Sequence, residues 1–253
     1  MKLVRFRYGE RIATGVAEDG VIRVLGGTFF EDPLPTGEEV AADDVRLLAP
    51  VLPSKIVCVG LNYKAHAVEL DKEIPAEPLL FLKPSTSVSG PGDPIHLHPA
   101  SERQDFEGEL AIVIGRLARR VSTPEAAAAA ILGFTCGNDV TLRDLQAKDH
   151  QWTRAKGFDS SNPLGPCIGT GIDGADLAIE TRVNGGVRQS SRTSDMAFGP
   201  VALVSYITQY MTLLPGDVIM TGTPAGIGPM SVGDRVEVEI EGIGVLANQA
   251  VNE

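Results

Sequence analysis

The sequence predicts a β-rich α+β fold. Short apolar runs recur along the 253 residues and are bounded by glycine, proline or other turn residues, as strands commonly are. Two pairs of runs are joined by glycine turns, which is typical of β-hairpins: 177–183 with 187–192, and 236–240 with 244–250. Patterns of helical period are few and short, so only a few short helices are expected.

Residues 1–52 are expected to form a small β-rich domain. Its clearest strand is 21–25, an apolar run flanked by glycines, and a turn-rich stretch follows at 32–37. Two prolines stop regular structure in 48–53, so this segment is expected to be a linker. The larger domain is therefore expected to occupy residues 53–253.

The elements of the larger domain follow from the same patterns. Its apolar runs predict strands at 55–59, 79–82, 104–114, 133–139 and 218–220. Short helices are predicted at 62–70, 141–149 and 200–213. Ser122-Thr123-Pro124-Glu125 is a capping box with proline near the first helical position, so an alanine-rich helix is expected to run to about residue 132.

Composition argues against several classes of partner. The formal net charge is −11 and no dense block of lysine and arginine is present, which disfavours nucleic acid and anionic membranes and favours a small-molecule substrate. The first residues are charged, and no stretch approaches about 18 uninterrupted apolar residues, so a soluble, cytoplasmic protein is expected. Cys58, Cys136 and Cys167 are isolated, which predicts neither a disulfide framework nor a cysteine zinc site.

Three carboxylates alternate in the predicted strand 104–114. Because successive side chains of a strand point to opposite faces, Asp105, Glu107 and Glu109 should share one face. Carboxylates two residues apart lie ~7 Å from each other, where their repulsion is ~2.4 kcal/mol at an effective dielectric constant of about 20. A buried column of this kind needs a cation, whereas a solvated strand face is the simpler interpretation of the segment taken alone.

Asp139 lies at the end of the next predicted strand. Loop-facing carboxylates at strand ends are common ligands, although a helix cap is the simpler interpretation of this residue alone. Together with Glu107 and Glu109, it would supply three oxygen ligands and neither cysteine nor histidine. Such a set suits a hard ion, Mg²⁺ or Mn²⁺, better than zinc.

Other residues offer groups for acid–base chemistry and for an anionic substrate. His66 and Glu69 are three apart and would lie side by side on a helix, where the carboxylate would orient the imidazole as a base that activates water. A surface ion pair is the simpler interpretation. Lys156 could steady a developing enolate, or be solvated. The segment 221–229 could offer backbone N–H groups to a substrate carboxylate, or be a structural turn.

Taken in order, six segments resemble the fumarylacetoacetate hydrolase family, and the resemblance runs from about residue 55 to 251. The segments are Val57-Cys58-Val59-Gly60-Leu61-Asn62-Tyr63-Lys64-Ala65-His66, Phe81-Leu82-Lys83-Pro84, Asp105-Phe106-Glu107-Gly108-Glu109-Leu110, Gly137-Asn138-Asp139-Val140-Thr141-Leu142-Arg143-Asp144, Lys156-Gly157-Phe158-Asp159 and Thr221-Gly222-Thr223-Pro224-Ala225-Gly226-Ile227-Gly228. No single motif is specific, but six in one order are. The resemblance implies a mixed β-sandwich roll, usually a homodimer, with the small N-terminal unit of many bacterial members.

The resemblance also implies roles for individual residues. Glu107, Glu109 and Asp139 would bind Mg²⁺ or Mn²⁺, which replaces the solvated-face interpretation of the acidic strand. His66 and Glu69 would form a water-activating dyad on a lid that orders over the substrate. The other implied positions are catalytic Lys156 and Gln146, the carboxylate-binding Thr223 with its neighbour Gly222, and Lys83 and Arg143 near the pocket.

The leading functional hypothesis from the resemblance is a metal-dependent hydrolase that cleaves a C–C bond of an acylpyruvate-type 2,4-dioxo acid through an enolate held by the metal. The alternatives with the same site are a 2-hydroxyhepta-2,4-diene-1,7-dioate isomerase of aromatic catabolism and an oxaloacetate-type decarboxylase. A non-catalytic, metal-dependent binder of 2-oxo acids is the alternative from another class. Retention of both His66 and Glu69 argues against the binder, because binding alone requires no base.

Overall fold

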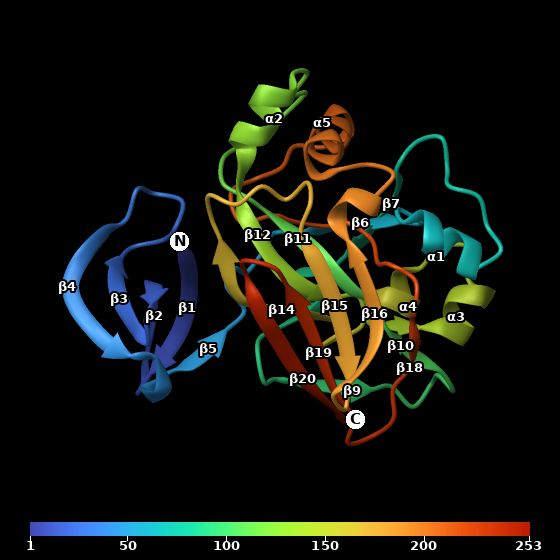
Figure 1. Ribbon diagram of the computed structural model, residues 1–253, viewed down its shortest axis with the longest axis horizontal. Helices are drawn as coiled ribbons and strands as arrows, with labels where there is room; N and C mark the ends of the chain where they lie inside the picture. Colours follow the sequence, from blue (N-terminus) through green and yellow to red (C-terminus); the bar gives the residue numbers. More distant parts are fainter.

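The computed structural model describes all residues from Met1 to Glu253 and confirms the β-rich prediction. Figure 1 shows a small unit of strands on one side and a larger body on the other. The small unit contains β1 (Lys2–Tyr8), β2 (Arg11–Glu18), β3 (Val21–Gly26), β4 (Leu34–Ala41) and β5 (Arg46–Leu48). Strand β4 begins inside the stretch that the sequence predicts to be a turn, where Leu34 pairs with Gly26.

The small unit and the body share one twelve-stranded sheet. Strand β1 pairs with β14 (Asn162–Gly169) of the body through only two residue pairs, Lys2 with Gly169 and Leu3 with Ile168. From β14 the sheet continues through the other strands of the body, which are β12 (Ile131–Asn138), β11 (Gly108–Ile114), β17 (Val218–Met220), β6 (Ile56–Gly60) and β7 (Leu79–Lys83), with β8 (Val88–Ser89) beside β14. The boundary between residues 52 and 53 stays a prediction.

Two further sheets and five short helices complete the body. The five-stranded sheet is ordered β16 (Gly186–Arg192), β15 (Ala178–Val183), β19 (Arg235–Ile240), β20 (Gly244–Asn252) and β9 (Pro94–Leu97). The three-stranded sheet is ordered β13 (Thr141–Leu142), β10 (Gln104–Phe106) and β18 (Gly228–Pro229). The helices are α1 (Lys64–Glu69), α2 (Pro124–Ala130), α3 (Arg143–Lys148), α4 (Thr153–Lys156) and α5 (Pro200–Tyr210). No helix combines the length and apolar character that crossing a lipid bilayer requires.

Strand β11 lies at the centre of the sandwich and is buried on both faces. On one face, Leu110 and Ile112 belong to the largest hydrophobic cluster, which also contains side chains of the five-stranded sheet such as Val238. On the other face, Ala111 and Val113 belong to a second cluster with β6 and β17. Because the carboxylates occupy one strand face, the alternation predicts core contacts only for the opposite face, with Phe106, Leu110 and Ile112. Strand β11 is therefore more deeply enclosed than its alternating polar start suggests.

The acidic segment is not the single strand that the sequence predicts. Regular pairing stops at Glu107, because its N–H donates to the side-chain oxygen of Asn138 (2.9 Å) and not to a backbone carbonyl oxygen of a neighbouring strand. The residues before the break join the three-stranded sheet, and those after it join the main sheet. The alanine-rich helix also ends earlier than predicted, at Ala130, because Ile131 already begins β12. Its N-cap is Thr123, whose hydroxyl accepts the N–H of Ala126 (3.2 Å).

Candidate active site

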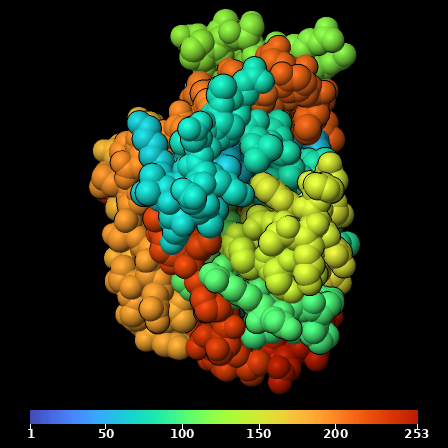
Figure 2. Space-filling model, turned by 90° about the vertical axis from the view of Figure 1, so that its right-hand side faces the viewer, coloured from blue at the N-terminus to red at the C-terminus, as the bar shows by residue number.

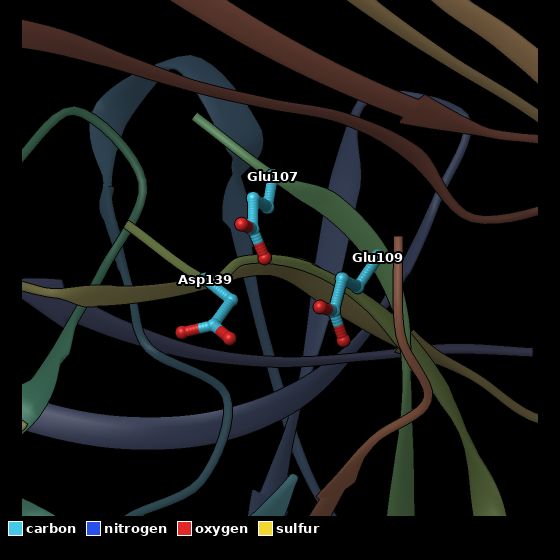
Figure 3. Close-up of side chains that lie close together, drawn as sticks. All are labelled: Glu107, Glu109 and Asp139. Atoms are coloured by element: carbon cyan, nitrogen blue, oxygen red, sulfur yellow. The ribbon is translucent and has the colours of Figure 1, made fainter. Parts of the chain in front are cut away.

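The carboxylates of Glu107, Glu109 and Asp139 meet in the interior (Figure 3). Strand pairing brings them together, because Gly108 lies opposite Asn138 in the antiparallel pair β11–β12. One oxygen from each side chain lies within 4.8 Å of the others, and all three residues are buried. A Cβ atom at Gly108 would lie 2.0 Å from the hydroxyl oxygen of Thr181, so only glycine fits between the two glutamates.

Two of the three carboxylates have cationic partners. Lys156 Nζ donates to Asp139 Oδ2 (2.6 Å), to Glu107 Oε2 (3.0 Å) and to the hydroxyl of a neighbouring threonine. Lys83 pairs with the other oxygen of Asp139, and Arg143 with the other oxygen of Glu107. Although burial opposes ionisation of Glu107, Lys156 and Arg143 lower the pKa of its carboxyl group to about 2.

Glu109 has no cationic partner. The only hydrogen bond to its carboxylate comes from the backbone N–H of Gly222 (2.7 Å). Burial, together with repulsion from Asp139 and Glu107, raises the pKa of Glu109 well above its usual value. A buried carboxylate without a counter-charge, beside two other carboxylates, fits a divalent cation. Because all three ligands are oxygen, the residues present suit Mg²⁺ or Mn²⁺.

A small cavity opens above the carboxylates. The polar and charged residues in its wall are His66, Lys72, Glu107, Glu109, Asp139, Arg143, Gln146, Lys156 and Thr223. The remainder of the wall is largely apolar, with Leu61, Leu70, Phe81 and Trp152 among its residues. Figure 2 shows the segment of α1 (cyan) beside the segment of α3 and α4 (yellow-green) on one face of the molecule. The cavity therefore lies among α1, α3, α4 and the ends of β11 and β12.

His66 and Glu69 form the pair that the sequence predicts, but not at the surface. His66 is only 5 % exposed, and its Nδ1 lies 2.9 Å from Glu69 Oε2. The other carboxylate oxygen of Glu69 accepts the N–H of Gly226 (3.0 Å), which ties α1 to the segment 221–229. With its proton on Nδ1 and donated to Glu69, His66 has the lone pair of Nε2 free for a proton from a substrate or a water.

The segment after β17 is fixed to the acidic strand. Its residue Gly222 has a φ of +93°, a backbone conformation that favours glycine, and its N–H is directed at Glu109. The hydroxyl of Thr223 donates to the carbonyl oxygen of Gly108 (2.9 Å). The N–H of Gly222 thus orients the carboxylate of Glu109, while the backbone N–H of Thr223 has no acceptor in the protein. Substrate binding by these two residues stays a prediction.

Arg143 joins several predicted site residues. Its guanidinium donates to Asp105 (2.9 Å), to Glu107 and to the side-chain oxygen of Gln146 (2.7 Å). Gln146 lines the cavity, as do Arg143 and Lys156. Lys83 does not line the cavity, because it lies behind Asp139 and donates to the carbonyl oxygen of Ser161 (2.7 Å). The structure therefore places Lys83 in contact with a metal-ligand candidate and not with the substrate space.

Gln189 was not predicted as a site residue, yet it connects two parts of the site. Its Oε1 accepts the N–H of Gly108 (2.9 Å), and its Nε2 donates to Thr223 Oγ1 and to the carbonyl oxygen of Pro224 (2.7 Å each). It is the only buried residue of β16. The sequence offers no signal for this role, because Gln189 stands among polar residues of an exposed hairpin strand.

Replacing Gln189 by alanine is expected to destabilise the fold and to weaken cation binding. The change leaves a buried N–H and two buried acceptors without partners, so the free energy of unfolding should fall by about 1–3 kcal/mol. Because Gly108 lies between two ligands, cation affinity should fall about 10–100-fold. Urea denaturation and Mn²⁺ titration measure the two effects. The exposed neighbour Ser190→Ala is the matched control, and equal behaviour of the two variants would contradict the role of Gln189.

Comparison with family models gives two adjacent matches. Residues 55–251 match the model described as fumarylacetoacetate (FAA) hydrolase C-terminal. Residues 1–50 match the model described as Rv2993c-like, N-terminal. The two matches together leave only a few residues of the chain unmatched.

Relatives of the chain carry several activities in their names. Human oxaloacetate tautomerase FAHD2A, mitochondrial, is 42 % identical over 221 residues, which are 82 % of this chain and 70 % of the human protein. The crystal structure of 2-hydroxyhepta-2,4-diene-1,7-dioate isomerase from Mycobacterium marinum is 46 % identical, with a TM-score of 0.93 over 100 % of this chain and 99 % of that one. Fumarylacetoacetate hydrolase from Exiguobacterium antarcticum is 40 % identical, with a TM-score of 0.90 over 100 % of both chains.

Proposed function

Because the chain belongs to the fumarylacetoacetate hydrolase family, we propose that it is a divalent-metal-dependent enzyme that enolises 2-oxo acids. Members of this family are enzymes, with hydrolases, isomerases and tautomerases among the relatives of this chain. Tautomerisation, isomerisation and hydrolysis of such acids share one demand, which is negative charge at the keto oxygen. The observation that carries the proposal is a histidine base in the same cavity as three buried carboxylates.

The three carboxylates form the floor of the cavity, which suits an anionic substrate when a divalent cation is bound there. Glu107, Glu109 and Asp139 would hold a Mg²⁺ or Mn²⁺ ion, which would supply Lewis-acid chemistry for a 2-oxo acid. Lys156 places a buried positive charge beside two of these residues, where it favours negative charge developing at the keto oxygen. The unpaired backbone N–H of Thr223 is available to the substrate carboxylate.

His66 performs the proton transfer in this proposal. Its Nε2 removes a proton from the carbon next to the keto group. The electron pair of that C–H bond forms the new C=C bond, and the π electrons of the C=O bond move to the keto oxygen. Delivering the proton to the keto oxygen completes a tautomerisation to the enol, and delivering it to a conjugated carbon completes an isomerisation. Glu69 keeps the proton of the neutral imidazole on Nδ1, so the base faces the cavity.

Hydrolysis of an acylpyruvate is the second candidate function, and the His66–Glu69 pair favours it. In this reaction His66 removes a proton from water, whose oxygen attacks the 4-carbonyl of a 2,4-dioxo acid. Cleavage of the bond between C3 and C4 then releases a carboxylic acid and the enolate of pyruvate, which takes up the proton. The same base and the same anionic floor serve both candidates.

A substrate panel tests the proposal. With Mg²⁺ or Mn²⁺ present, the purified protein should accelerate the interconversion of enol and keto oxaloacetate, and excess EDTA should abolish the acceleration. Formation of acetate and pyruvate from acetylpyruvate would identify the hydrolase, and release of CO₂ from oxaloacetate the decarboxylase. No turnover of any acid, with metal-dependent binding of oxalate retained, would contradict an enzyme and favour a binder.

A further inference from the structure

Lys72 follows the helix that carries the histidine and is held by that helix. Asp71 has a φ of +53° and donates its N–H to the carbonyl oxygen of Val68 (3.1 Å). The N–H of Lys72 donates to the carbonyl oxygen of Ala67 (2.9 Å). These two bonds form a Schellman cap with a left-handed residue at its centre. The backbone of Lys72 is therefore fixed relative to α1, although its side chain is exposed.

The cations in the cavity wall differ in their partners. Lys156 contacts two carboxylates and a hydroxyl group, and Arg143 contacts two carboxylates and an amide oxygen. Lys72 lines the same cavity, but its ammonium group has neither an ion pair nor a hydrogen bond in the protein. It is the one lysine or arginine of the wall whose charge no protein group compensates.

The reactive end of a 2-oxo acid belongs at the carboxylate floor, so its other end faces the remaining wall. That wall is apolar at Leu61, Phe81 and Trp152, which can pack against carbon but offer no partner to a charge. An unpaired ammonium group in such a wall attracts a second anionic group of the ligand. We propose that Lys72 binds the distal carboxylate of the substrate and makes the enzyme select 2-oxo dicarboxylates over monocarboxylates, an inference that rests on the proposed function.

Matched pairs of acids isolate the distal group. Oxaloacetate ends in a carboxylate where 2-oxobutyrate has a methyl group. The acids 2-oxoglutarate and 2-oxovalerate differ in the same way and are one carbon longer. Exchange of the C3 hydrogens with D₂O, followed by NMR in the presence of Mg²⁺, measures enolisation of all four acids. Subtracting the exchange that Mg²⁺ alone produces gives kcat/KM for each acid.

Lys72→Met is expected to lower kcat/KM for at least one dicarboxylate by about 10–100-fold, through KM, because a hydrogen bond to a charged group is lost. The two monocarboxylates should change by less than about twofold, since they never contact the ammonium group. Lys72→Arg should restore most of the preference, because it keeps the positive charge. Lys64→Met is the matched control, since Lys64 is an exposed lysine at the start of α1 that does not line the cavity.

The outcomes separate the two proposals. In one case the wild type exchanges the acids while Lys72→Met leaves kcat/KM unchanged, or lowers it equally for both members of a pair. Either result would overturn the role of Lys72 and leave the proposed function standing. Equal losses in Lys64→Met and Lys72→Met would likewise overturn it, because they would report the general positive charge around α1. Wild-type protein without exchange of any acid above the Mg²⁺ background would refute the proposed function, and this inference with it.

Discussion

Replacing Glu109 by glutamine is expected to abolish divalent-cation binding and to lower turnover by about 10³-fold, because Lewis-acid stabilisation worth several kcal/mol is lost. Of the three carboxylates, only Glu109 has no cationic partner, so its replacement breaks no internal salt bridge. Glutamine keeps the size of the side chain and an acceptor for the N–H of Gly222. The loss should therefore come from charge and not from a collapsed site.

Thermal unfolding tests whether that interpretation is right. For the wild type, Mn²⁺ at about 100 times its Kd should add about 2.7 kcal/mol to the free energy of unfolding, and Glu109→Gln should show no such gain. Without metal, the variant should be at least as stable as the wild type, because repulsion from two neighbouring carboxylates is relieved. Glu102→Gln, an exposed glutamate shortly before the acidic segment, should behave as the wild type. A variant that keeps both the Mn²⁺ shift and turnover would contradict the site.

The elements of the fold were largely predictable, because most of them depend on local pattern. The hairpin of β15 and β16 follows from Asn184-Gly185, whose φ values of +52° and +78° are those of the expected tight turn. The break at Glu107 was not predictable, because it depends on Asn138 from another strand. Alternation of polar and apolar residues shows which residues share a face of a strand. It does not show where a side chain from another strand interrupts the backbone pairing.

The candidate site was also predictable only in part. The three carboxylates could be proposed as one site because their types and order resemble a family, and the pairing of β11 with β12 brings them together. Gln189 and the free ammonium group of Lys72 could not be proposed, since each depends on contacts, or on the lack of them, that only the folded chain defines. The homodimer stays a prediction, as do the individual roles of the site residues.

His66→Ala is expected to lower enolisation, or hydrolysis if that is the reaction, by about 10²–10⁴-fold, which is the usual loss for a general base. His66 is buried beside Glu69, so the variant removes the only imidazole in the cavity wall. Glu69→Gln removes the charge and one of the two acceptor oxygens that His66 and Gly226 contact, but it leaves the imidazole in place, so its loss should be smaller. His150→Ala removes an exposed histidine outside the cavity and should leave the rate unchanged. Mn²⁺-induced stabilisation of each variant shows that the carboxylates still bind the ion.

The pattern of losses in His66→Ala decides which proton the histidine moves. If C3 exchange of oxaloacetate and cleavage of acetylpyruvate both fall, His66 takes the proton from carbon in one reaction and from water in the other. If cleavage is lost while exchange and decarboxylation persist, His66 activates water only, and the charge around Lys156 suffices for enolate formation. Undiminished rates in both reactions would exclude His66 as the base, because no other imidazole lines the cavity to replace it.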